Sequence, residues 1–346
     1  MATIDDVARL AGVSTATVSR ALRGLPLVSE ETVARVVRAA ETLGYVASPS
    51  ASRLAGGRTG SIGLVVPRIS RWFSATIAEA AQDALARAGY DLLLYNLFGR
   101  EEARRQLFHS QWLRHRVDAI VLVAIPLRDE DIEALSTRKL PGVTVSSGTA
   151  VPRWPSVRID DAAAARAATE YLIGLGHTRI AHICGGAPDE LACATHLDRR
   201  SGYHAALRAA GIEPDPAMEV AAEFTNSGGD RATGELLRRG VVPTAIFAAC
   251  DEMAMGALSA LRRARLRVPE DVSVVGIDDH DAAAAAGLTT VAQPVVEQGR
   301  RAAALLLKAL SAPVQTEGPS RPEVVPTRLV VRESTGPCGL PGESVR

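Results

Sequence analysis

The sequence predicts an all-helical N-terminal head followed by an α/β core of two similar lobes. Helix-start and helix-stop residues divide residues 1–46 into three short helices. A stretch of small residues with Pro49 and the pair Gly56-Gly57 then reads as a linker. From Ser61 onward, short apolar runs alternate with helical segments, and the alternation starts again near Thr169. Continuous apolar strands joined by helices indicate parallel sheets covered on both faces.

Composition limits the class of protein. The chain has 346 residues, of which 47% are hydrophobic, so it can bury more than one large core. No signal peptide is recognisable, and no apolar run approaches the roughly 20 residues that span a bilayer. The four cysteines form no C-x-x-C pair, which is typical of reduced thiols. These features predict a cytoplasmic protein that does not bind membranes.

Two helices of the head meet at a tight turn in the stretch DDVARLAGVSTATVSRAL. Gly12 can adopt the left-handed backbone that stops the first helix, and Ser14 can cap the second. The residues predicted to point inward are Val7, Ala8, Ala11, Val18, Ala21 and Leu22. The outer side of the second helix is therefore small, polar and basic.

A third helix is predicted in SEETVARVVRAAETLGY, with Ser29 as its cap, Glu30 and Glu31 in its first turn and Gly44 as its stop. Its predicted apolar stripe is Val33, Val36, Val37 and Ala40. Three such helices can close a minimal core. On these observations alone, a DNA-binding helix-turn-helix and an ordinary small helical bundle are equally compatible with the head.

The spacing of residues in the head is similar to the opening of the LacI/GalR family of bacterial transcription regulators. The matching residues are Thr3-Ile4-x-Asp6-Val7-Ala8, Ala11-Gly12-Val13-Ser14-x-x-Thr17-Val18-Ser19-Arg20-Ala21-Leu22, Val28-Ser29-Glu30-Glu31-Thr32 and Leu43-Gly44-Tyr45. The similarity extends, more loosely, over nearly the whole chain. The resemblance implies a helix-turn-helix DNA-binding domain at 1–46, a linker with a hinge helix at 47–60 and an effector-binding and dimerisation core at 61–346.

The resemblance also implies that the core is periplasmic-binding-protein-like, with two Rossmann-like lobes between which the chain crosses three times. The first lobe would comprise about 61–159 and 293–323, and the second about 160–292 and 324–340. Ligands of such sheets bind beyond the carboxyl ends of the strands, so we expect a small effector in the cleft between the lobes. The C-terminal tail has no heptad pattern for a larger assembly, so we expect a homodimer.

For DNA, the start of the second helix would enter the major groove. The residues implied for DNA binding are Thr3, Ser14, Thr15, Ala16, Thr17, Ser19 and Arg20 in the head and Ser52, Arg53 and Leu54 in the linker. Thr15 and Ala16 occupy positions that select operators, Arg20 fits a guanine or a phosphate contact, and Leu54 falls at the minor-groove wedge. Residues 1–60 contain seven arginines against five acidic residues, a small excess that suits groove reading.

For the effector, the implied residues are Trp72, Phe73, Ser146, Arg199, Phe224, Asp251 and Asp278. Arg199 precedes Gly202 by three positions, with Arg200 as the alternative, and Asp278 ends the strand VSVVGID. An arginine and an aspartate at strand ends can bind the hydroxyls of a neutral polyol, which favours a sugar as the effector. The other interpretation is that the two residues form a salt bridge between the lobes. Ser146, Ser147, Asp160 and Asp251 could instead cap a helix or stabilise a crossing.

Enzyme motifs are missing from the sequence. No G-x-G-x-x-G follows a strand, no G-x-S-x-G is present, and neither lysine follows a glycine as in a phosphate-binding loop. No histidine or cysteine cluster has ligand spacing. The sequence therefore predicts no enzyme, metal or cofactor, but a repressor of sugar-use genes that binds operator DNA, a small effector and a second copy. A purine- or nucleoside-responsive regulator is the alternative, which Cys193 disfavours because a purine reader has a longer polar residue there.

Overall fold

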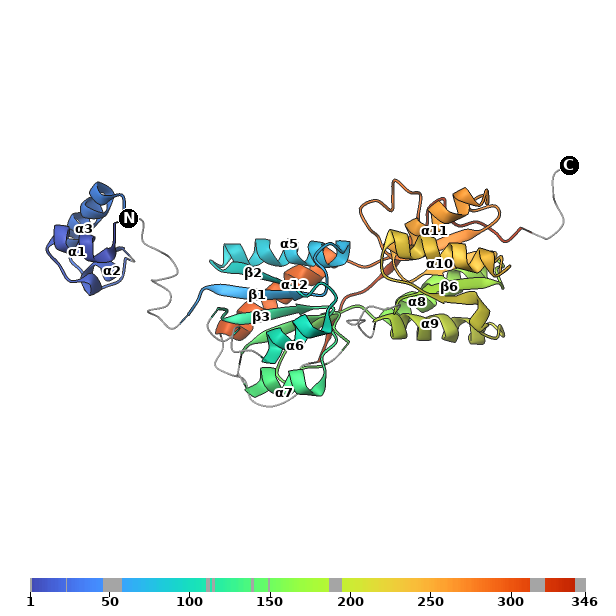
Figure 1. Cartoon of the computed structure of the whole chain (residues 1–346), viewed down its shortest axis with the longest axis horizontal. Coiled ribbons are helices and arrows are strands. Elements are labelled where there is room, and N and C mark those ends of the chain that lie inside the picture. The colour runs from blue at the N-terminus through green and yellow to red at the C-terminus, as the bar shows by residue number, and fades with distance from the viewer. Residues whose placement is uncertain are drawn as a thin grey trace. The chain divides into compact units, whose positions relative to one another are not determined.

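A computed structural model describes residues 2–22, 24–45, 58–109, 113, 116–137, 140–148, 150–186, 195–311 and 321–339. Two compact units are present, Met1–Gly60 and Ser61–Arg346, which are the helical head and the α/β core in Figure 1. Among the residues named from the sequence, those outside the described residues are Pro49, Ser52, Arg53, Leu54, Gly56, Gly57 and Cys193. No helix in the described part of the chain is long and apolar enough to cross a membrane.

The head contains α1 (Ile4–Ala11), α2 (Thr15–Leu22) and α3 (Glu30–Leu43). Thr3 and Asp6 cap α1 reciprocally, since Asp6 N donates to Thr3 Oγ1 at 3.3 Å and Thr3 N donates to Asp6 Oδ2 at 2.9 Å. Gly12 and Gly44 end α1 and α3 with φ of 65° and 60°. These local features confirm the predicted helix boundaries.

The head core is a small apolar cluster drawn from all three helices. Its buried members are Val7, Ala8, Ala11, Val18, Ala21, Val36, Ala39 and Ala40. The prediction that Val37 belongs to this core is wrong, because Val37 is 37% exposed. At 3.6 residues per turn, Val37 lies about 100° around α3 from Val36, and Ala39 takes the inward position instead.

The first lobe is built on a parallel six-stranded sheet with the order β11-β5-β4-β3-β1-β2. Its strands are β1 (Ser61–Val66), β2 (Asp91–Asn96), β3 (Ala119–Val123), β4 (Gly142–Val145), β5 (Ser156–Arg158) and β11 (Glu323–Val324). Its helices are α5 (Trp72–Arg87), α6 (Glu101–His109), α7 (Asp129–Thr137) and α12 (Val295–Ser311).

Helices cover both faces of the first sheet, as Figure 1 shows. Alternate residues of β1 and β3 pack on different helices. Ile62 and Leu64 share a cluster with α5 and α12, whereas Ile120 and Leu122 share one with α6 and α7. Burial on both faces explains why the strands read as continuous apolar runs.

The second lobe is built on a six-stranded sheet with the order β12-β10-β9-β8-β6-β7, parallel except for β12 against β10. Its strands are β6 (Ile180–Cys184), β7 (Glu219–Ala221), β8 (Ala245–Ala248), β9 (Ser273–Asp278), β10 (Thr289–Ala292) and β12 (Arg328–Val330). Its helices are α8 (Asp161–Gly174), α9 (Thr195–Ala209), the short 3-10 helix η2 (Pro216–Met218), α10 (Asn226–Arg238) and α11 (Asp251–Arg263).

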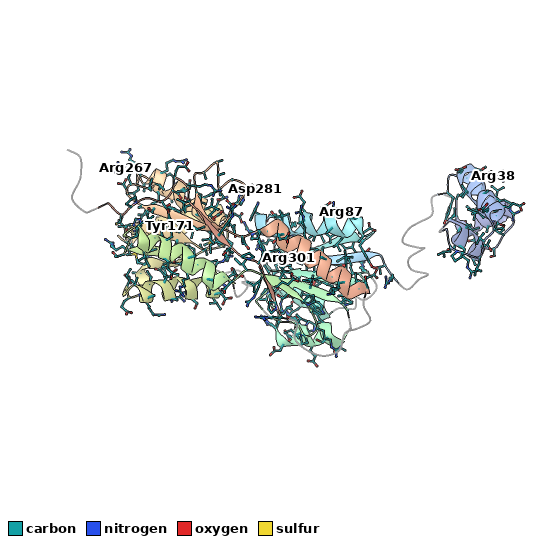
Figure 2. All side chains as sticks on the ribbon, turned by 180° about the vertical axis from the view of Figure 1, so that it is seen from behind. Arg38, Arg87, Tyr171, Arg267, Asp281 and Arg301 are labelled. Atoms are coloured by element: carbon teal, nitrogen blue, oxygen red, sulfur yellow. The ribbon has the colours of Figure 1, made fainter. Side chains whose placement is uncertain are left out.

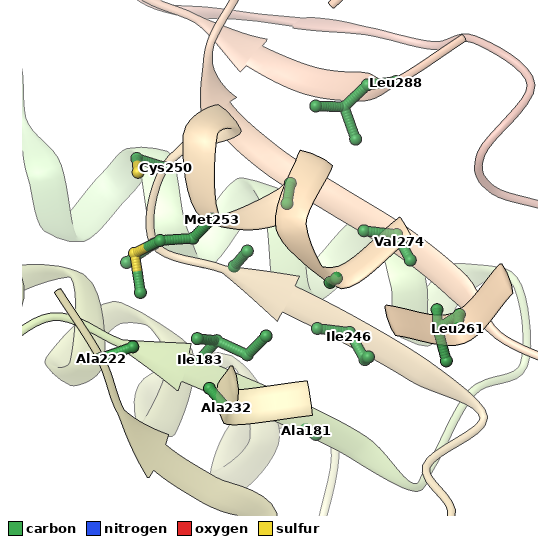
Figure 3. Packing of buried hydrophobic residues seen from close by; sticks show 14 of the residues in the cluster. Ala181, Ile183, Ala222, Ala232, Ile246, Cys250, Met253, Leu261, Val274 and Leu288 are labelled. Carbon is green, nitrogen blue, oxygen red and sulfur yellow. The ribbon is translucent and has the colours of Figure 1, made fainter. Parts of the chain in front are cut away.

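The core of the second lobe is divided by its sheet in the same way. One cluster joins β6, β8 and β9 to α10 and α11, and the other joins the same strands to α8 and α9. Figure 3 shows the first cluster, with Ile183 and Ile246 on neighbouring strands and Met253 and Cys250 near the start of α11. This packing fixes the position of the loops at the carboxyl ends of the strands.

The chain passes between the lobes at three places. It leaves the first sheet after β5 and enters the second lobe at α8; it returns between β10 and α12; and it passes again between β11 and β12. Two halves of similar α/β design therefore lie side by side, and the three connections limit how they can move. The sequence prediction of two α/β lobes behind a helical head is confirmed.

Candidate functional site

The outer side of α2 is the candidate DNA-binding face of the head. Thr15, Ala16 and Arg20 are exposed there, and Thr17 and Ser19 are half-buried. Because α2 packs inward through Val18 and Ala21, its exposed start leaves small and basic side chains free for contacts to a partner. Small side chains at this place let a helix approach base edges closely.

Two of the hydroxyls assigned to DNA binding already serve as helix caps. Thr3 caps α1 with Asp6, as described above, and the Ser14 Oγ accepts a hydrogen bond from Thr17 N at 3.2 Å. The Ser14 and Thr17 hydroxyls are also 2.9 Å apart. These hydroxyls therefore stabilise the first turns of α1 and α2 through contacts within each helix start.

A cavity of about 460 Å³ lies between the two lobes of the core. Loops after β1, β3 and β4 and the start of α5 line it from the first lobe, and loops after β6, β7, β8 and β9 line it from the second. Five of the seven residues implied for effector binding are among its polar and aromatic lining. These are Phe73, Ser146, Arg199, Phe224 and Asp278.

Arg199 lies on α9, not at a strand end as the sequence suggested, because α9 begins at Thr195. The residue is 4% exposed, and its guanidinium pairs with Asp161 on α8, the Arg199 Nε and Nη2 atoms both lying 2.9 Å from Asp161 Oδ1. The Arg199 Nη1 donates to the Ala249 carbonyl. Asp161 and Asp278 belong to the same lobe as Arg199, so this ion pair is not the inter-lobe salt bridge considered from the sequence.

Asp278 ends β9 and starts a chain of buried hydrogen bonds that reaches the first lobe. Gln293 Nε2 donates to Asp278 Oδ1 at 2.5 Å, and Gln298 Nε2 donates to Gln293 Oε1 at 3.0 Å. Ser146 Oγ donates to Gln298 Oε1 at 3.4 Å. Because Ser146 follows β4, the chain joins polar groups of both cavity walls.

Two residues assigned to the effector site do not line the cavity. Asp251 is fully buried behind its wall, where it accepts hydrogen bonds from Thr290 Oγ1 at 2.7 Å and His280 N at 2.9 Å. Trp72 contacts the His280 ring across the lobes in a tilted arrangement, with ring centroids 5.0 Å apart. Asp251 stabilises a crossing, as one interpretation of the sequence had it.

The weaker sequence candidates Asp160 and Ser147 also have local roles. Asp160 caps α8, because its Oδ1 accepts a hydrogen bond from Ala163 N at 2.9 Å. The Ser147 Oγ lies 3.4 Å from the Val145 carbonyl oxygen, to which it donates. Neither residue lines the cavity.

The sequence reasoning missed several lining residues. Arg68, Arg71, Ser74, Cys250 and Glu252 all face the cavity. Cys250 and Glu252 flank Asp251 at the start of α11, after β8, so the rule that sites lie beyond carboxyl strand ends could have found them. Burial raises the pKa of the Cys250 thiol, which keeps it a neutral hydrogen-bonding group.

Burial also perturbs the acids of the cavity. Desolvation raises the pKa of Asp278, against the opposing effect of Arg199. It raises the pKa of Glu252 to about 7, opposed by Arg71, whose Nη1 lies 3.7 Å from Glu252 Oε1 across the cleft. Desolvation and then the charge of Asp278 raise the pKa of Asp251. The cavity therefore holds carboxyl groups that titrate near neutral pH.

Stability should fall as the pH rises from about 6.5 to 8. A folded-state pKa of about 7 for Glu252 exceeds its unfolded value, so the folded protein holds more protons and loses this advantage on deprotonation. The buried histidines, whose pKa values are lowered, oppose this only at lower pH. Melting temperature against pH should therefore decline by several °C, and Glu252→Gln should flatten the decline. An equal slope in that variant would contradict the assignment.

Comparisons with known proteins agree with this geometry. The family model "Bacterial regulatory proteins, lacI family" matches residues 3–48, and "Periplasmic binding protein-like domain" matches residues 169–335. The chain is 36% identical over 311 residues to the HTH-type transcriptional regulator GalR of Escherichia coli (strain K12), which covers 89% of each chain.

Two solved structures are similar along nearly the full chain. A complex of the transcriptional regulator CelR with cellobiose has a TM-score of 0.71 and 34% identity, covering 96% of this chain and 100% of that one. The lac repressor dimer bound to operator and the anti-inducer ONPF has a TM-score of 0.83 and 28% identity, covering 97% and 99%. Head, core and relatives agree that this chain belongs to the LacI family and is a DNA-binding transcriptional regulator.

Proposed function

We propose that this regulator is a homodimeric repressor of carbohydrate-use genes whose affinity for operator DNA is controlled by a sugar. The observation that carries the proposal is the cavity that both lobes line. Arg199 and Asp278 face it from the second lobe, and Phe73 and Ser146 face it from the first. An effector that contacts both walls binds one arrangement of the lobes more tightly than another. Only such a difference in effector affinity can change the affinity for operator DNA.

The lining favours a small polyol. A cavity of about 460 Å³ falls within the roughly 300–1,000 Å³ of ligand pockets. Phe73 and Phe224 offer apolar rings for the face of a sugar, while Arg199 and Asp278 offer a donor and an acceptor for its hydroxyls. The CelR complex with cellobiose supports this class of effector.

The DNA partner would be a near-palindromic operator, because two identical heads related by a two-fold axis read two identical half-sites. The lac repressor structure, which is a dimer on its operator, supports this assembly. Ser52, Arg53 and Leu54 lie outside the described residues and remain proposed linker contacts, with Leu54 as the minor-groove wedge.

The effector proposal is tested by a calorimetric screen of sugars and nucleosides on the full-length protein, followed by operator titrations with the best ligand. We expect a sugar to bind with one site per chain and to weaken operator binding. Binding of nucleosides alone would favour the purine-responsive alternative. Operator affinity that no bound ligand changes would contradict control through the cavity.

Exchanging the side chains of Thr15 and Ala16 should change the choice of operator. Both residues are exposed at the start of α2, and each lost base contact costs about 1 to 3 kcal/mol. Selection of binding sites from a random pool measures the ranking. The matched control exchanges Thr42 and Ala34, which are exposed on α3, and should keep the ranking. An unchanged ranking in the α2 variant would show that these residues do not read bases.

A further inference from the structure

In the first lobe, the wall of the cavity presents a hydroxyl and a guanidinium that pair with no residue in the described ranges. Ser74, in the first turn of α5, is only 2% exposed and lines the cavity. Its hydroxyl forms no hydrogen bond with any residue in the described ranges. A buried hydroxyl without a protein partner, open to a cavity, is a donor for a ligand.

The first turn of α5 adds to this wall. Its N-cap is Arg71, which has no side-chain acceptor, and no side-chain hydrogen bond caps the helix. Arg71, Phe73 and Ser74 all line the cavity, so the start of this 16-residue helix faces it. The uncapped amides and the positive end of the helix dipole favour an anion there.

Arg68 supplies a positive charge at the same place. It lines the cavity and forms no ion pair with any residue that the structure describes. Its guanidinium lies against Gly99, where a Cβ would come within 2.6 Å of Arg68 Nη2. Gly99 N donates to the Pro67 carbonyl at 2.9 Å. This hydrogen bond joins the loop of Gly99, which the guanidinium contacts, to the loop of Arg68. The charge is thus held in place rather than free in solvent.

The acids near this wall do not neutralise it. Glu223 pairs with Arg231 in the second lobe. Glu252 reaches Arg71 only at 3.7 Å across the cleft. Because burial raises the pKa of Glu252 to about 7, its repulsion of a bound anion is reduced near neutral pH. Among the residues that the structure describes, no acid pairs with Arg68.

We propose that the effector carries a phosphate monoester and that Arg68, Arg71, Ser74 and the first turn of α5 bind it. This inference rests on the proposed function, since it assumes that the cavity holds the effector. Two guanidinium groups, a hydroxyl and the uncapped turn provide more donors than the two oxygens of a carboxylate accept, and they suit the three terminal oxygens of a phosphate. The Arg199 and Asp278 end of the cavity would hold the remainder of the molecule.

The test titrates inorganic phosphate into the full-length protein by calorimetry at constant ionic strength. We expect saturable binding with one site per chain. Arg68→Gln should weaken it about tenfold, as expected for one lost charge-assisted contact, and Ser74→Ala should weaken it less. Arg68→Lys, which keeps the charge but not the planar donor pair, should bind with intermediate affinity.

The control is Arg87→Gln at the other end of α5, where Figure 2 labels Arg87. Arg87 is exposed and pairs with Asp83. This variant should bind phosphate like the wild type. A melting curve and an operator titration on each variant show whether the fold and the head are intact. Absence of saturable phosphate binding, or equal affinity in the Arg68→Gln and Arg87→Gln variants, would overturn the proposal.

A second arm identifies the source of the phosphate. Glucose 6-phosphate and adenosine monophosphate are titrated beside glucose and adenosine. Tighter binding of either phosphorylated probe than of its neutral partner, lost in Arg68→Gln, supports the subsite and tells a sugar phosphate from a nucleotide. Neutral sugars that bind and release operator without any dependence on Arg68 would refute the subsite and leave the proposed function standing. Phosphate binding at Arg68 without any effect of ligands on operator affinity would refute the proposed function alone.

Discussion

Arg199→Met is expected to lower the free energy of unfolding by about 3 to 5 kcal/mol and to abolish the response of operator binding to the effector. The stability loss follows from burial: Asp161, 8% exposed, would lose the guanidinium that faces it at 2.9 Å. Removing one partner of a buried ion pair leaves an uncompensated charge, which costs this amount. The functional loss follows because Arg199 also lines the cavity.

Urea unfolding and operator titration with the effector measure the two effects separately. Adding Asp161→Asn to Arg199→Met should restore much of the stability, because the stranded charge is removed, without restoring the effector response. Recovery of both in the double variant would show that Arg199 acts only through Asp161 and not on the ligand.

Arg200→Met is the matched control for this experiment. Arg200 is the neighbouring residue that sequence spacing could not exclude as the effector arginine, but its side chain is 47% exposed and pairs with Glu219 at 2.5 Å. The Glu219 side chain is only 8% exposed, but Glu219 Oε1 keeps its contact to His204 Nε2 at 2.8 Å, so this variant should lose less stability than Arg199→Met and should keep its response. If Arg200→Met abolished the effector response and Arg199→Met kept it, Arg200 would be the effector-binding arginine.

The helical head was the most predictable part of the chain, because its determinants are local. Ser29 caps α3 by accepting a hydrogen bond from Thr32 N, and Gly12 and Gly44 take the left-handed backbone that ends a helix. Such contacts lie within four residues and can be read from the sequence. Val37 was misplaced because apolar residues adjacent in sequence lie about 100° apart on a helix and cannot share one narrow stripe.

The cavity was less predictable, because its geometry depends on contacts between distant segments. Asp161 precedes Arg199 by 38 residues, and no spacing rule pairs them. In the sequence, Asp251 and Asp278 have the same features, because each is an acid beside the end of a predicted strand and the two strands are consecutive. The structure separates them only because Thr290 and the His280 amide hold Asp251 behind the wall.

Ser74 and Gln293 had no sequence feature that marked them as site residues. A serine in the first turn of a helix is common, and only the packed structure shows that Ser74 is buried against the cavity, without a hydrogen-bond partner among the described residues. Gln293 lies in the stretch TVAQP, where no motif or spacing marks it as a site residue. Its position between two lobes depends on α12 returning to the first sheet, which is a property of the whole chain.

Gln293→Leu is expected to lower the free energy of unfolding by about 2 to 6 kcal/mol and to weaken the coupling between effector and operator. Gln293 donates to Asp278 and accepts from Gln298, and all three side chains are at most 6% exposed. Its removal leaves a buried carboxylate without this donor and a buried amide without its acceptor. Each unsatisfied group costs about 1 to 3 kcal/mol.

Comparison with Gln298→Leu separates stability from coupling. That variant leaves the Gln293 contact to Asp278 in place but cuts the chain to Ser146 in the first lobe. Effector affinity should then change little, because Arg199 and Asp278 keep their partners. The dependence of operator affinity on the effector should fall, because the two walls are no longer joined through buried hydrogen bonds.

Gln106→Leu provides the matched control, since Gln106 is exposed on α6 and its Nε2 donates to Glu102 Oε1 at 3.0 Å. A surface substitution of this kind should change stability by no more than about 0.5 kcal/mol. If the Gln293 and Gln298 variants matched this control in urea unfolding and in operator titration with the effector, the buried chain would be neither a stabilising nor a coupling element. The arrangement of the lobes would then depend on contacts in the cavity alone. Asp278 would affect operator binding by contacting the effector, and its hydrogen bond to Gln293, in the segment that leads to α12, would have no part in the coupling.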